Sequence, residues 1–355
     1  MGYCCVVIHQ PSMMFCSCRK SHEDNDLLRL QGILPASLQE SWNPHCVQIL
    51  LSGNPFMCLN VDGSENGLIN LIKKLKIEIL LTNEKYANKF RTKLEKSKKL
   101  KDFKLYEHAC EIWKTGVSND TSKNEDAARI DERERLLYAI QTSGSTGEKK
   151  IVQVTEDCIL PNILELREVF NVCPTDVIYY GSPVTFDPHI VELFLALTSG
   201  ASLFIVASKA RAAAIPTLVD ILFPEENSET PENDCARPTL LDVHFPEENP
   251  GNDGAISTLV DVHFPEENYE HDWCVTLIQT TPSVFLSWPK QQTRERVMRR
   301  LKVLALGGEE CPSQDKLSDY CSPADFSKIY NLYGITEVSC WASYNNCLLE
   351  GTGRL

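Results

Sequence analysis

Residues 136–150 read LLYAIQTSGSTGEKK, so that an apolar, strand-like run passes directly into a loop of small residues. The loop consists of Thr142, Ser143, Gly144, Ser145, Thr146 and Gly147, and Lys150 follows it. Small residues leave backbone N–H groups and hydroxyls free to surround an anion, and glycine permits the backbone angles that this requires. We therefore interpret the segment as a phosphate-binding loop rather than a flexible turn. It is not a Walker A loop, because Gly147 precedes Glu148 instead of a lysine.

Apolar strand-like runs alternate with helical patterns on both sides of the loop. The predicted strands are Val47–Leu51, Ile77–Leu81, Leu136–Gln141, Val177–Tyr180, Ser202–Val206, Cys274–Gln279, Leu301–Leu306 and Lys328–Leu332. The predicted helices are Leu68–Leu75, Ile190–Thr198 with its end at Gly200, one that opens at Pro282, and Arg294–Arg300. This alternation predicts an α/β fold with mostly parallel sheets flanked by helices.

The negative charge of the chain is concentrated in one segment. The formal net charge is −14, from 35 Lys and Arg against 49 Asp and Glu. Residues 220–272 hold fifteen of the acidic residues and a single basic one, Arg237, so the remainder of the chain is balanced. Nucleic-acid binding needs a basic face, and we therefore expect no nucleic-acid partner. No run approaches 18 apolar residues, and we expect no membrane partner either.

The acidic segment contains an internal repeat. The eleven residues Thr217–Asn227 recur at Thr239–Asn249 and at Thr258–Asn268, with spacers rich in Pro, Gly, Asn and Glu. Joining Asn227 to Tyr269 would leave an ordinary helix–loop–strand connection. We therefore interpret residues 228–268 as an inserted duplication of one helix, and expect the extra copies to remain exposed, mobile and unpacked.

The fifteen cysteines do not indicate a disulfide framework. Their number is odd, no secretory signal precedes them, and many lie in apolar runs. Reduced, buried cysteines of a cytoplasmic protein fit this pattern better. Cys16 and Cys18 lie near His9 and His22, but zinc sites usually use a more widely spaced cysteine pair and a second pair downstream.

Four motifs in a fixed order resemble the adenylate-forming (AMP-binding) enzymes, the family of acyl-CoA synthetases, luciferases and amino-acid-activating domains. The first is the loop of residues 142–150, with Lys149 where the family usually has proline. The others are Thr185-Phe186-Asp187, Leu306-Gly307-Gly308-Glu309, and the stretch from Asn331 to Glu337, NLYGITE. The resemblance implies an enzyme that uses ATP and Mg²⁺ to convert a carboxylate to an acyl-adenylate. It then transfers the acyl group to a thiol, either coenzyme A or phosphopantetheine on a carrier domain.

The resemblance also implies a role for each motif residue. Thr142 to Gly147 and Lys150 would hold the β- and γ-phosphates, and Thr336 would bond the α-phosphate. Glu337 would hold Mg²⁺, since a carboxylate suits that ion. Gly307, Gly308, Glu309, Asn331, Tyr333 and Gly334 would form the adenine side, with Tyr333 stacked on the ring. For Tyr333 the alternative is core packing, and for Glu309 it is a solvated strand end.

Asp187 bears on the class of substrate. The family's amino-acid branches carry Phe-Asp at this position, where the carboxylate pairs with the substrate ammonium, and this implies a small amino acid such as β-alanine. A buried carboxylate needs such a cationic partner. The alternative is a helix N-cap, because Asp187 precedes Pro188 and an apolar helix.

The resemblance gives the expected organisation of the chain. Residues 1–116 form a degenerate N-terminal α/β part, 117–135 a mobile linker, 136–345 the AMP-binding core interrupted by 228–268, and 346–355 an unpatterned tail. The family's later ribose-binding motif and C-terminal subdomain, with its catalytic lysine, are not found after Glu337. We therefore expect the large N-terminal subdomain alone, with impaired activity. The alternative is a non-catalytic nucleotide-binding remnant or scaffold fragment.

Overall fold

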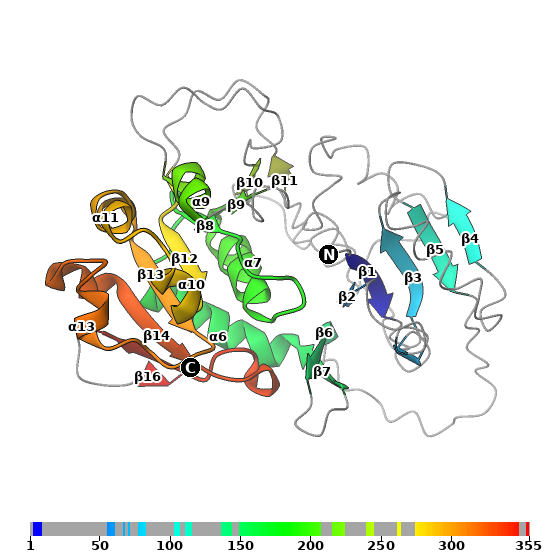
Figure 1. The fold of residues 1–355 in the computed structure, drawn as a ribbon. Helices are drawn as coiled ribbons and strands as arrows, with labels where there is room; N and C mark the ends of the chain where they lie inside the picture. Colours follow the sequence, from blue (N-terminus) through cyan, green and yellow to red (C-terminus); the bar gives the residue numbers. More distant parts are fainter. Residues whose placement is uncertain are drawn as a thin grey trace, which may run out of the picture. The chain divides into compact units, whose positions relative to one another are not determined.

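A computed structural model describes residues 3–8, 55–60, 67, 70–71, 77–82, 103–106, 111–115, 136–143, 149–206, 215–223, 239–244, 261–263, 274–347 and 353–354. The chain divides into two compact units, Met1–Cys158 and Ile159–Leu355 (Figure 1). The predicted strand at Val47–Leu51 and the linker at 117–135 lie outside the described residues.

Unit 1 contains one sheet, with the strand order β4-β5-β3-β1-β2-β6-β7. Its strands are β1 (Tyr3–Ile8), β2 (Phe56–Asn60), β3 (Ile77–Thr82), β4 (Phe103–Tyr106), β5 (Glu111–Thr115), β6 (Leu136–Ser143) and β7 (Lys149–Thr155). Neighbours are antiparallel except β2 and β6, where Phe56 pairs with Tyr138 in parallel. The strands predicted at Ile77–Leu81 and Leu136–Gln141 are confirmed. Of the predicted helix Leu68–Leu75, only Asn70 and Leu71 are described, and both are helical.

Unit 2 contains the larger sheet, ordered β11-β10-β9-β8-β12-β13-β14-β15-β16. Its strands are β8 (Val177–Tyr179), β9 (Ser202–Ile205), β10 (Thr239–His244), β11 (Asp261–His263), β12 (Leu277–Thr280), β13 (Val303–Gly307), β14 (Ile329–Tyr333), β15 (Ser343–Asn346) and β16 (Gly353–Arg354). The central strands from β9 to β14 are parallel, and those outside them are antiparallel. Five predicted strands therefore form the parallel centre of this sheet.

Helical segments alternate with the strands of unit 2, and they include the helices predicted at Ile190–Thr198, after Pro282 and at Arg294–Arg300 (Figure 1). They are α6 (Glu156–Val169), α7 (Pro188–Ser199), α9 (Ile215–Leu222), α10 (Pro282–Leu286), α11 (Lys290–Gln292), η2 (Thr293–Val297), α12 (Met298–Arg300), α13 (Gln314–Leu317), η3 (Pro323–Lys328) and η4 (Thr336–Val338). Helix α7 ends at Gly200, whose φ of 67° is left-handed as predicted for a C-cap. Among the described residues, none of the helices has the length and apolar character needed to cross a bilayer.

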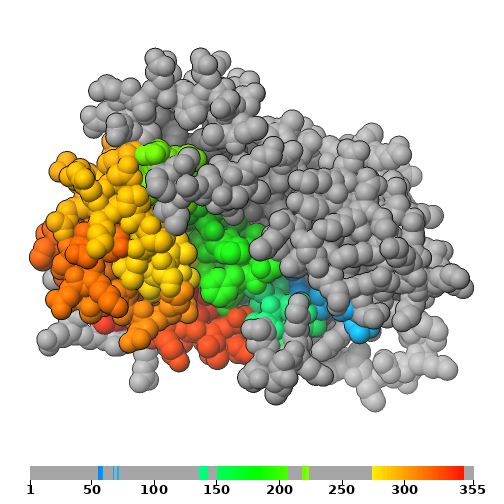
Figure 2. Space-filling view, in the orientation of Figure 1, coloured from blue at the N-terminus to red at the C-terminus, as the bar shows by residue number. Residues whose placement is uncertain are grey.

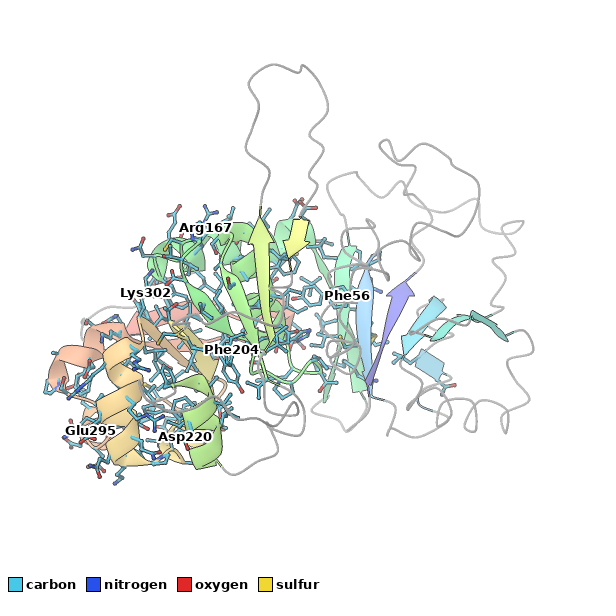
Figure 3. All side chains as sticks on the ribbon, turned by 90° about the horizontal axis from the view of Figure 1, so that it is seen from above. Phe56, Arg167, Phe204, Asp220, Glu295 and Lys302 are labelled. Carbon is cyan, nitrogen blue, oxygen red and sulfur yellow. The ribbon has the colours of Figure 1, made fainter. Side chains whose placement is uncertain are left out.

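The core of unit 2 lies between the parallel strands and these helices. Phe204 and Leu304 from the sheet pack in one buried cluster with Val219 of α9, Phe285 of α10 and Val297 of η2. Figure 3 shows Phe204 in this interior, with Asp220 and Glu295 on helices at one side of the unit. The yellow-to-orange surface in Figure 2 is formed by the segments from β12 to α13, which also supply several buried residues of the cluster.

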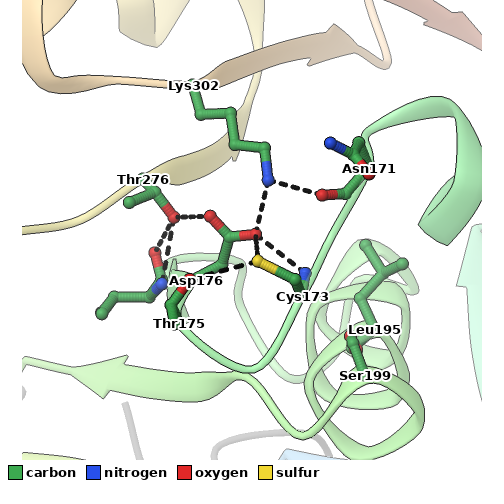
Figure 4. A network of polar contacts seen from close by, with 9 residues as sticks. Asn171, Cys173, Thr175, Asp176, Leu195, Ser199, Thr276 and Lys302 are labelled. Carbon is green, nitrogen blue, oxygen red and sulfur yellow. Dashed lines mark hydrogen bonds and ion pairs between the residues drawn. The ribbon is translucent and has the colours of Figure 1, made fainter.

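A polar network joins three parallel strands at their N-terminal ends (Figure 4). The Asp176 carboxylate, which is buried just before β8, pairs with Nζ of Lys302 at 2.7 Å. It also accepts hydrogen bonds from the Thr276 hydroxyl at 2.9 Å and from the Cys173 backbone N–H at 2.9 Å. Thr276 precedes β12 and Lys302 precedes β13, so the network ties together the N-terminal ends of these three strands. We call it the Asp176 clamp.

The repeated segment corrects one prediction. The first copy begins in a helix, α9, as expected. The second and third copies contain strands β10 and β11 instead of helices, and β10 pairs antiparallel with β9 through Leu240 and Phe204. These described parts are thus paired in the sheet rather than unpacked. The physical reason is that β9 offers an unpaired edge, and backbone pairing with that edge outweighs the local helical preference.

Candidate functional site

The three downstream motifs lie at the same edge of unit 2, where the parallel strands have their carboxyl ends. Residues 180–187 follow β8, Gly308 and Glu309 follow β13, and residues 334–337 follow β14. Carboxyl ends of neighbouring parallel strands meet at one edge of a sheet, which is where α/β proteins bind ligands. The polar network around Asp176 lies at the opposite, N-terminal ends of these strands. The motifs and the network are therefore separated by the length of the strands.

Asp187 is the most deeply buried acid of these motifs, with 4% of its surface exposed. The side chains of Thr336 and Cys340 favour the charged form of this carboxylate. Burial nevertheless raises the pKa of the Asp187 carboxyl, and the negative charge of Glu337 raises this pKa further. The motif that contains Asp187 and the motif that contains Thr336 and Glu337 are far apart in the sequence, and both act on this carboxylate. Its negative charge is not balanced by the groups around it.

The helix-cap alternative for Asp187 lacks its defining contact. Asp187 occupies the N-cap position of α7, and Pro188 is the first helical residue. Its backbone, however, is helical, at φ −51° and ψ −26°, and its side chain makes no capping hydrogen bond. The N-cap position therefore does not account for the burial of this carboxylate.

A second buried acid, Glu192 of helix α7, belongs to a network of hydrogen bonds next to these motifs. The Ser182 hydroxyl donates to Oε1 of Glu192 at 2.5 Å, and Gln279 Nε2 donates to the Pro188 carbonyl at 2.9 Å. Gln279 Nε2 lies 3.5 Å from Oε1 of Glu192, and the Trp341 indole N–H donates to Gln279 Oε1 at 2.9 Å. Glu192, Gln279 and Trp341 were not predicted as site residues. The only local signal was a charged residue, Glu192, within an apolar helix.

Gly307 and Gly308 differ in their surroundings. Gly307 is buried, and a β-carbon there would lie 2.3 Å from the Trp341 indole. Gly308 is exposed and has a φ of +81°, which favours glycine, and a β-carbon there would lie 3.5 Å from the Phe186 ring. Gly308 is thus the glycine that presents open backbone, and Gly307 makes room for Trp341.

Glu309 is exposed and is held in place by the start of helix α10. Its Oε2 accepts hydrogen bonds from the Ser283 hydroxyl and from the Ser283 backbone N–H, the latter at 2.9 Å. These hydrogen bonds, led by the hydroxyl, lower the pKa of the Glu309 carboxyl. The residue is therefore ordered as well as solvated, and it stays charged.

Tyr333 ends strand β14 with 70% of its surface exposed. This exposure leaves its ring face open for stacking and argues against the core-packing alternative. Asn331 is half-buried within β14 and pairs with Leu306 of β13. A β-carbon on Gly334 would lie 2.1 Å from the Cys340 carbonyl oxygen, so only glycine fits this turn.

The turn after Tyr333 holds Thr336 half-buried and Glu337 exposed on η4. It ends with two non-glycine residues in left-handed conformation, Ser339 at φ 61° and Cys340 at φ 78°. Such backbone strain persists only where the surroundings enforce it. Here the side-chain amide of Asn162 donates to the Trp341 carbonyl at 3.2 Å. The strained turn carries Thr336 and Cys340, two of the groups that act on the pKa of the Asp187 carboxyl.

The predicted phosphate loop belongs to unit 1 and is described only at its two ends. Thr142 is half-buried in β6, and Ser143 is the last residue of that strand. Lys150 is exposed in β7 and pairs with Thr142 across the hairpin. Gly144, Ser145, Thr146 and Gly147 lie outside the described residues.

Metal-binding capacity in the described part of the chain is limited. No group of three or more His, Cys, Asp or Glu residues there could hold a metal ion. Glu337 is an exposed carboxylate, which fits an ion such as Mg²⁺ that is bound through one or two carboxylates and substrate phosphates. Cys16 and Cys18 lie outside the described residues.

Comparison with known proteins agrees with the motifs. Residues 47–222 match the family model described as AMP-binding enzyme. The chain is 35% identical over 218 residues to the beta-alanine-activating enzyme of Danio rerio and 34% identical over 212 residues to that of Homo sapiens. These alignments cover 61% and 59% of this chain and 15% of each relative, so the chain spans about 15% of the length of these relatives.

One solved structure supports the fold. Apo MatB from Rhodopseudomonas palustris superimposes with a TM-score of 0.51 at 12% identity, over 88% of this chain and 50% of that one. At this identity the likeness concerns the fold alone. It confirms the predicted α/β architecture.

Proposed function

The chain belongs to the AMP-binding enzyme family, and from this premise we propose that it activates the carboxylate of a small amino acid, such as β-alanine, with ATP. A carboxylate oxygen of the amino acid attacks the α-phosphorus of ATP, and pyrophosphate leaves. The product is an acyl-adenylate, which a thiol of coenzyme A or of a phosphopantetheine carrier then attacks. The residues of the chain contribute alignment and charge neutralisation to this reaction.

The observation that carries the proposal is the buried carboxylate of Asp187. Within the described residues, the structure records no ion pair between Asp187 and a lysine or arginine. An ionised carboxylate at this depth is unfavourable unless a cation reaches it. The ammonium group of an amino acid supplies that cation, whereas a fatty acid has none.

The residues around this carboxylate are proposed to contact the nucleotide. The adenine ring would stack on Tyr333 and pass the open backbone of Gly308, with Glu309, Asn331 and Gly334 shaping the same side. Thr336 would bond the α-phosphate. The loop from Thr142 to Gly147, with Lys150, would hold the β- and γ-phosphates. Glu337 would hold Mg²⁺, which when bound neutralises phosphate charge.

We place this activity in the cytoplasm. The described cysteines are free, as expected of proteins from a reducing compartment. The proposed partners are small molecules and, for the thiol step, coenzyme A or a carrier domain. β-Alanine is the first substrate to test, because the relatives named above are beta-alanine-activating enzymes.

The nucleotide half of the proposal is tested by isothermal titration of Mg-ATP into the full chain. Lys150→Ala removes a phosphate contact, and Gly147→Val blocks the approach of phosphate to the backbone. Loss of one charge-assisted contact costs about 1.5–3 kcal/mol, so each variant should bind roughly ten- to hundredfold more weakly. Unchanged affinity in both variants would refute the phosphate assignment.

The substrate half is tested by titrating β-alanine and propionate in the presence of Mg-ATP. Asp187→Ala should weaken β-alanine binding strongly and leave propionate binding nearly unchanged, because only β-alanine carries an ammonium. β-Alanine-dependent exchange of pyrophosphate with ATP then reports activation itself. Nucleotide binding without any response to β-alanine would favour the non-catalytic remnant.

A further inference from the structure

Glu192 is buried completely in helix α7 and is not among the residues proposed to contact substrate or nucleotide. Both of its carboxylate oxygens hold one residue. Oε1 accepts a hydrogen bond from the Ser182 hydroxyl at 2.5 Å, and Oε2 accepts one from the Ser182 backbone N–H at 3.2 Å. Helix α7 is otherwise rich in apolar residues, and a buried carboxylate is costly. Packing alone therefore does not explain an acid at this position.

The residue that Glu192 holds begins the segment that leads to Asp187. Within this segment the Phe186 backbone N–H donates to the Pro183 carbonyl at 2.8 Å and closes a turn. The proline ring at position 183 fixes one more backbone angle. A short, turned segment of this kind has little freedom once its first residue is anchored. The position of Ser182 thus influences the position of Asp187.

Gln279 of β12 holds the chain on the other side of Asp187. Its Nε2 donates to the carbonyl of Pro188, the next residue, at 2.9 Å. The same Nε2 lies 3.5 Å from Oε1 of Glu192. Asp187 is therefore preceded by an anchor at Ser182 and followed by one at Pro188. Glu192 reaches the first anchor directly and the second through the Gln279 amide.

The Gln279 amide also connects to the segment that follows the strained turn. Its Oε1 accepts the indole N–H of Trp341 at 2.9 Å, and the Trp341 carbonyl accepts the Asn162 side-chain amide at 3.2 Å. The nitrogen of an amide donates and its oxygen accepts, so the contacts with Trp341 and Pro188 fix one orientation of the Gln279 side chain. The network thus links the segments that follow β8 and β14 with strand β12 itself.

We propose that Glu192 is a positioning residue for recognition of the substrate ammonium, because it holds Asp187 in place without touching the substrate. The inference rests on the proposed function, in which Asp187 pairs with that ammonium. A carboxylate that is already in place loses little freedom when the cation arrives, and affinity rises without a new contact. Propionate has no ammonium, so its binding gains nothing from this placement.

The alternative is that Glu192 only stabilises the fold. In that case its loss should affect β-alanine, propionate and Mg-ATP alike, or none of them. A positioning role predicts a selective loss of β-alanine affinity. The matched control is Asp176→Asn, because the Asp176 clamp is also a buried carboxylate network but lies at the N-terminal ends of the strands, away from the motifs.

The test titrates β-alanine and propionate into the full chain in the presence of Mg-ATP. Glu192→Ala should bind β-alanine roughly ten- to hundredfold more weakly, with propionate and Mg-ATP binding nearly unchanged. Glu192→Gln keeps a hydrogen-bonding group of the same shape and should recover most of the affinity. Ser182→Ala, which retains the backbone contact, is a milder variant should Glu192→Ala not fold, and it should show the same selectivity to a smaller extent.

Two results would overturn the positioning role. One is an equal loss of β-alanine and propionate binding in the folded Glu192 and Ser182 variants, or no loss in either variant. The other is the same selective loss of β-alanine binding in Asp176→Asn, which would show that any destabilisation produces it.

A second measurement needs no substrate. Backbone hydrogen exchange over residues 182–190 is followed by mass spectrometry in the ligand-free protein. Glu192→Ala and Ser182→Ala should speed exchange there, whereas Asp176→Asn should not. If the wild type binds no β-alanine, the proposed function and the role in ammonium recognition both fail, and faster exchange would leave only the anchoring of the segment. If the wild type binds β-alanine but exchange is unmoved in both variants, the positioning role alone fails.

Discussion

Gly307 and Trp341 are packed so closely that a β-carbon on the glycine would lie 2.3 Å from Cη2 of the indole. The indole cannot easily move aside, because it is buried and its N–H donates to Gln279 at 2.9 Å. The carboxyl end of β13 is thus fixed against the segment that follows the strained turn at Ser339 and Cys340.

Gly307→Ala is therefore expected to destabilise the protein. Overpacking a rigid site usually costs about 1–3 kcal/mol of unfolding free energy. Urea unfolding followed by circular dichroism measures this loss. Adding Trp341→Ala to the Gly307→Ala variant should cost less than Trp341→Ala costs alone, because the clash is relieved. Equal costs in both backgrounds would show that the two residues do not compete for space.

The Asp176 clamp, at the N-terminal ends of the parallel strands, leads us to expect that the protein loses stability in acid. Burial by itself raises the pKa of the Asp176 carboxyl, but hydrogen bonds from Lys302, Cys173 and Thr276 together bring this pKa below its ordinary value. A carboxyl with a lowered folded-state pKa stabilises the protein above its unfolded pKa of about 3.9. The stabilisation is lost as the pH falls through the folded value.

Asp176→Asn should accordingly cost about 1.5–3 kcal/mol at neutral pH, the range for a charge-assisted hydrogen bond. The difference from the wild type should shrink as the pH falls below about 4. Urea unfolding across this pH range measures both effects. Asp319→Asn is the control, because Asp319 pairs with Lys290 at the exposed surface, where ion pairs contribute little. Equal losses in the two variants would contradict a special role for the clamp.

Asp187 predicts the opposite dependence on pH. Burial raises the pKa of its carboxyl, so its contribution to stability is fully present below about pH 3.9 and is lost as the pH rises through the folded value. Asp187→Asn should then be as stable as the wild type at neutral pH, or more stable, although it binds β-alanine poorly. A purely structural residue would lose stability instead.

Affinity for β-alanine should follow the same ionisation. In the wild type it should rise with pH until Asp187 is fully charged and then level off, whereas in Asp187→Asn it should be flat. Titration of β-alanine at a series of pH values, with propionate in parallel, measures this. A rise that persists in the Asn variant would assign the effect to another group.

Much of unit 2 could be predicted because its signals are local. The run from Val177 to Tyr180 and the apolar helix ended by Gly200 need no distant partner to be identified. The placement of Asp187 and Glu309 at the carboxyl ends of the parallel strands is a finding of the structure, which the sequence analysis did not predict. The linker and the loop from Gly144 to Gly147 remain predictions. Within residues 346–355, Asn346 ends β15 and Gly353–Arg354 form β16.

The supporting residues of the site could not be predicted, because their roles depend on distant contacts. Gln279 is an ordinary strand residue until the fold brings Trp341 and Pro188 to its side-chain amide. Cys340 has no distinguishing pattern in the sequence, and its burial at the end of a strained turn is seen only in the fold. Such contacts are fixed by tertiary packing and leave no periodic signal.

The repeat offers the sharpest comparison of local with distant effects, because near-identical sequences adopt different structures. Thr217–Leu222 is helical, whereas Thr239–His244 is strand β10, which pairs with β9. Deletion of residues 228–268 would remove β10 and leave the outer edge of β9 unpaired. Exposed strand edges promote association between chains. We therefore expect this deletion to lower the urea midpoint and to cause aggregation, as measured by sedimentation.

The matched control deletes only residues 250–268, which removes β11 and retains β10 on the edge of β9. This shorter deletion should stay monodisperse, with a midpoint close to that of the wild type, because β11 contributes only a short outer strand. If the long deletion is equally stable and soluble, pairing of β10 with β9 contributes nothing. The inserted copies would then be a dispensable duplication after all.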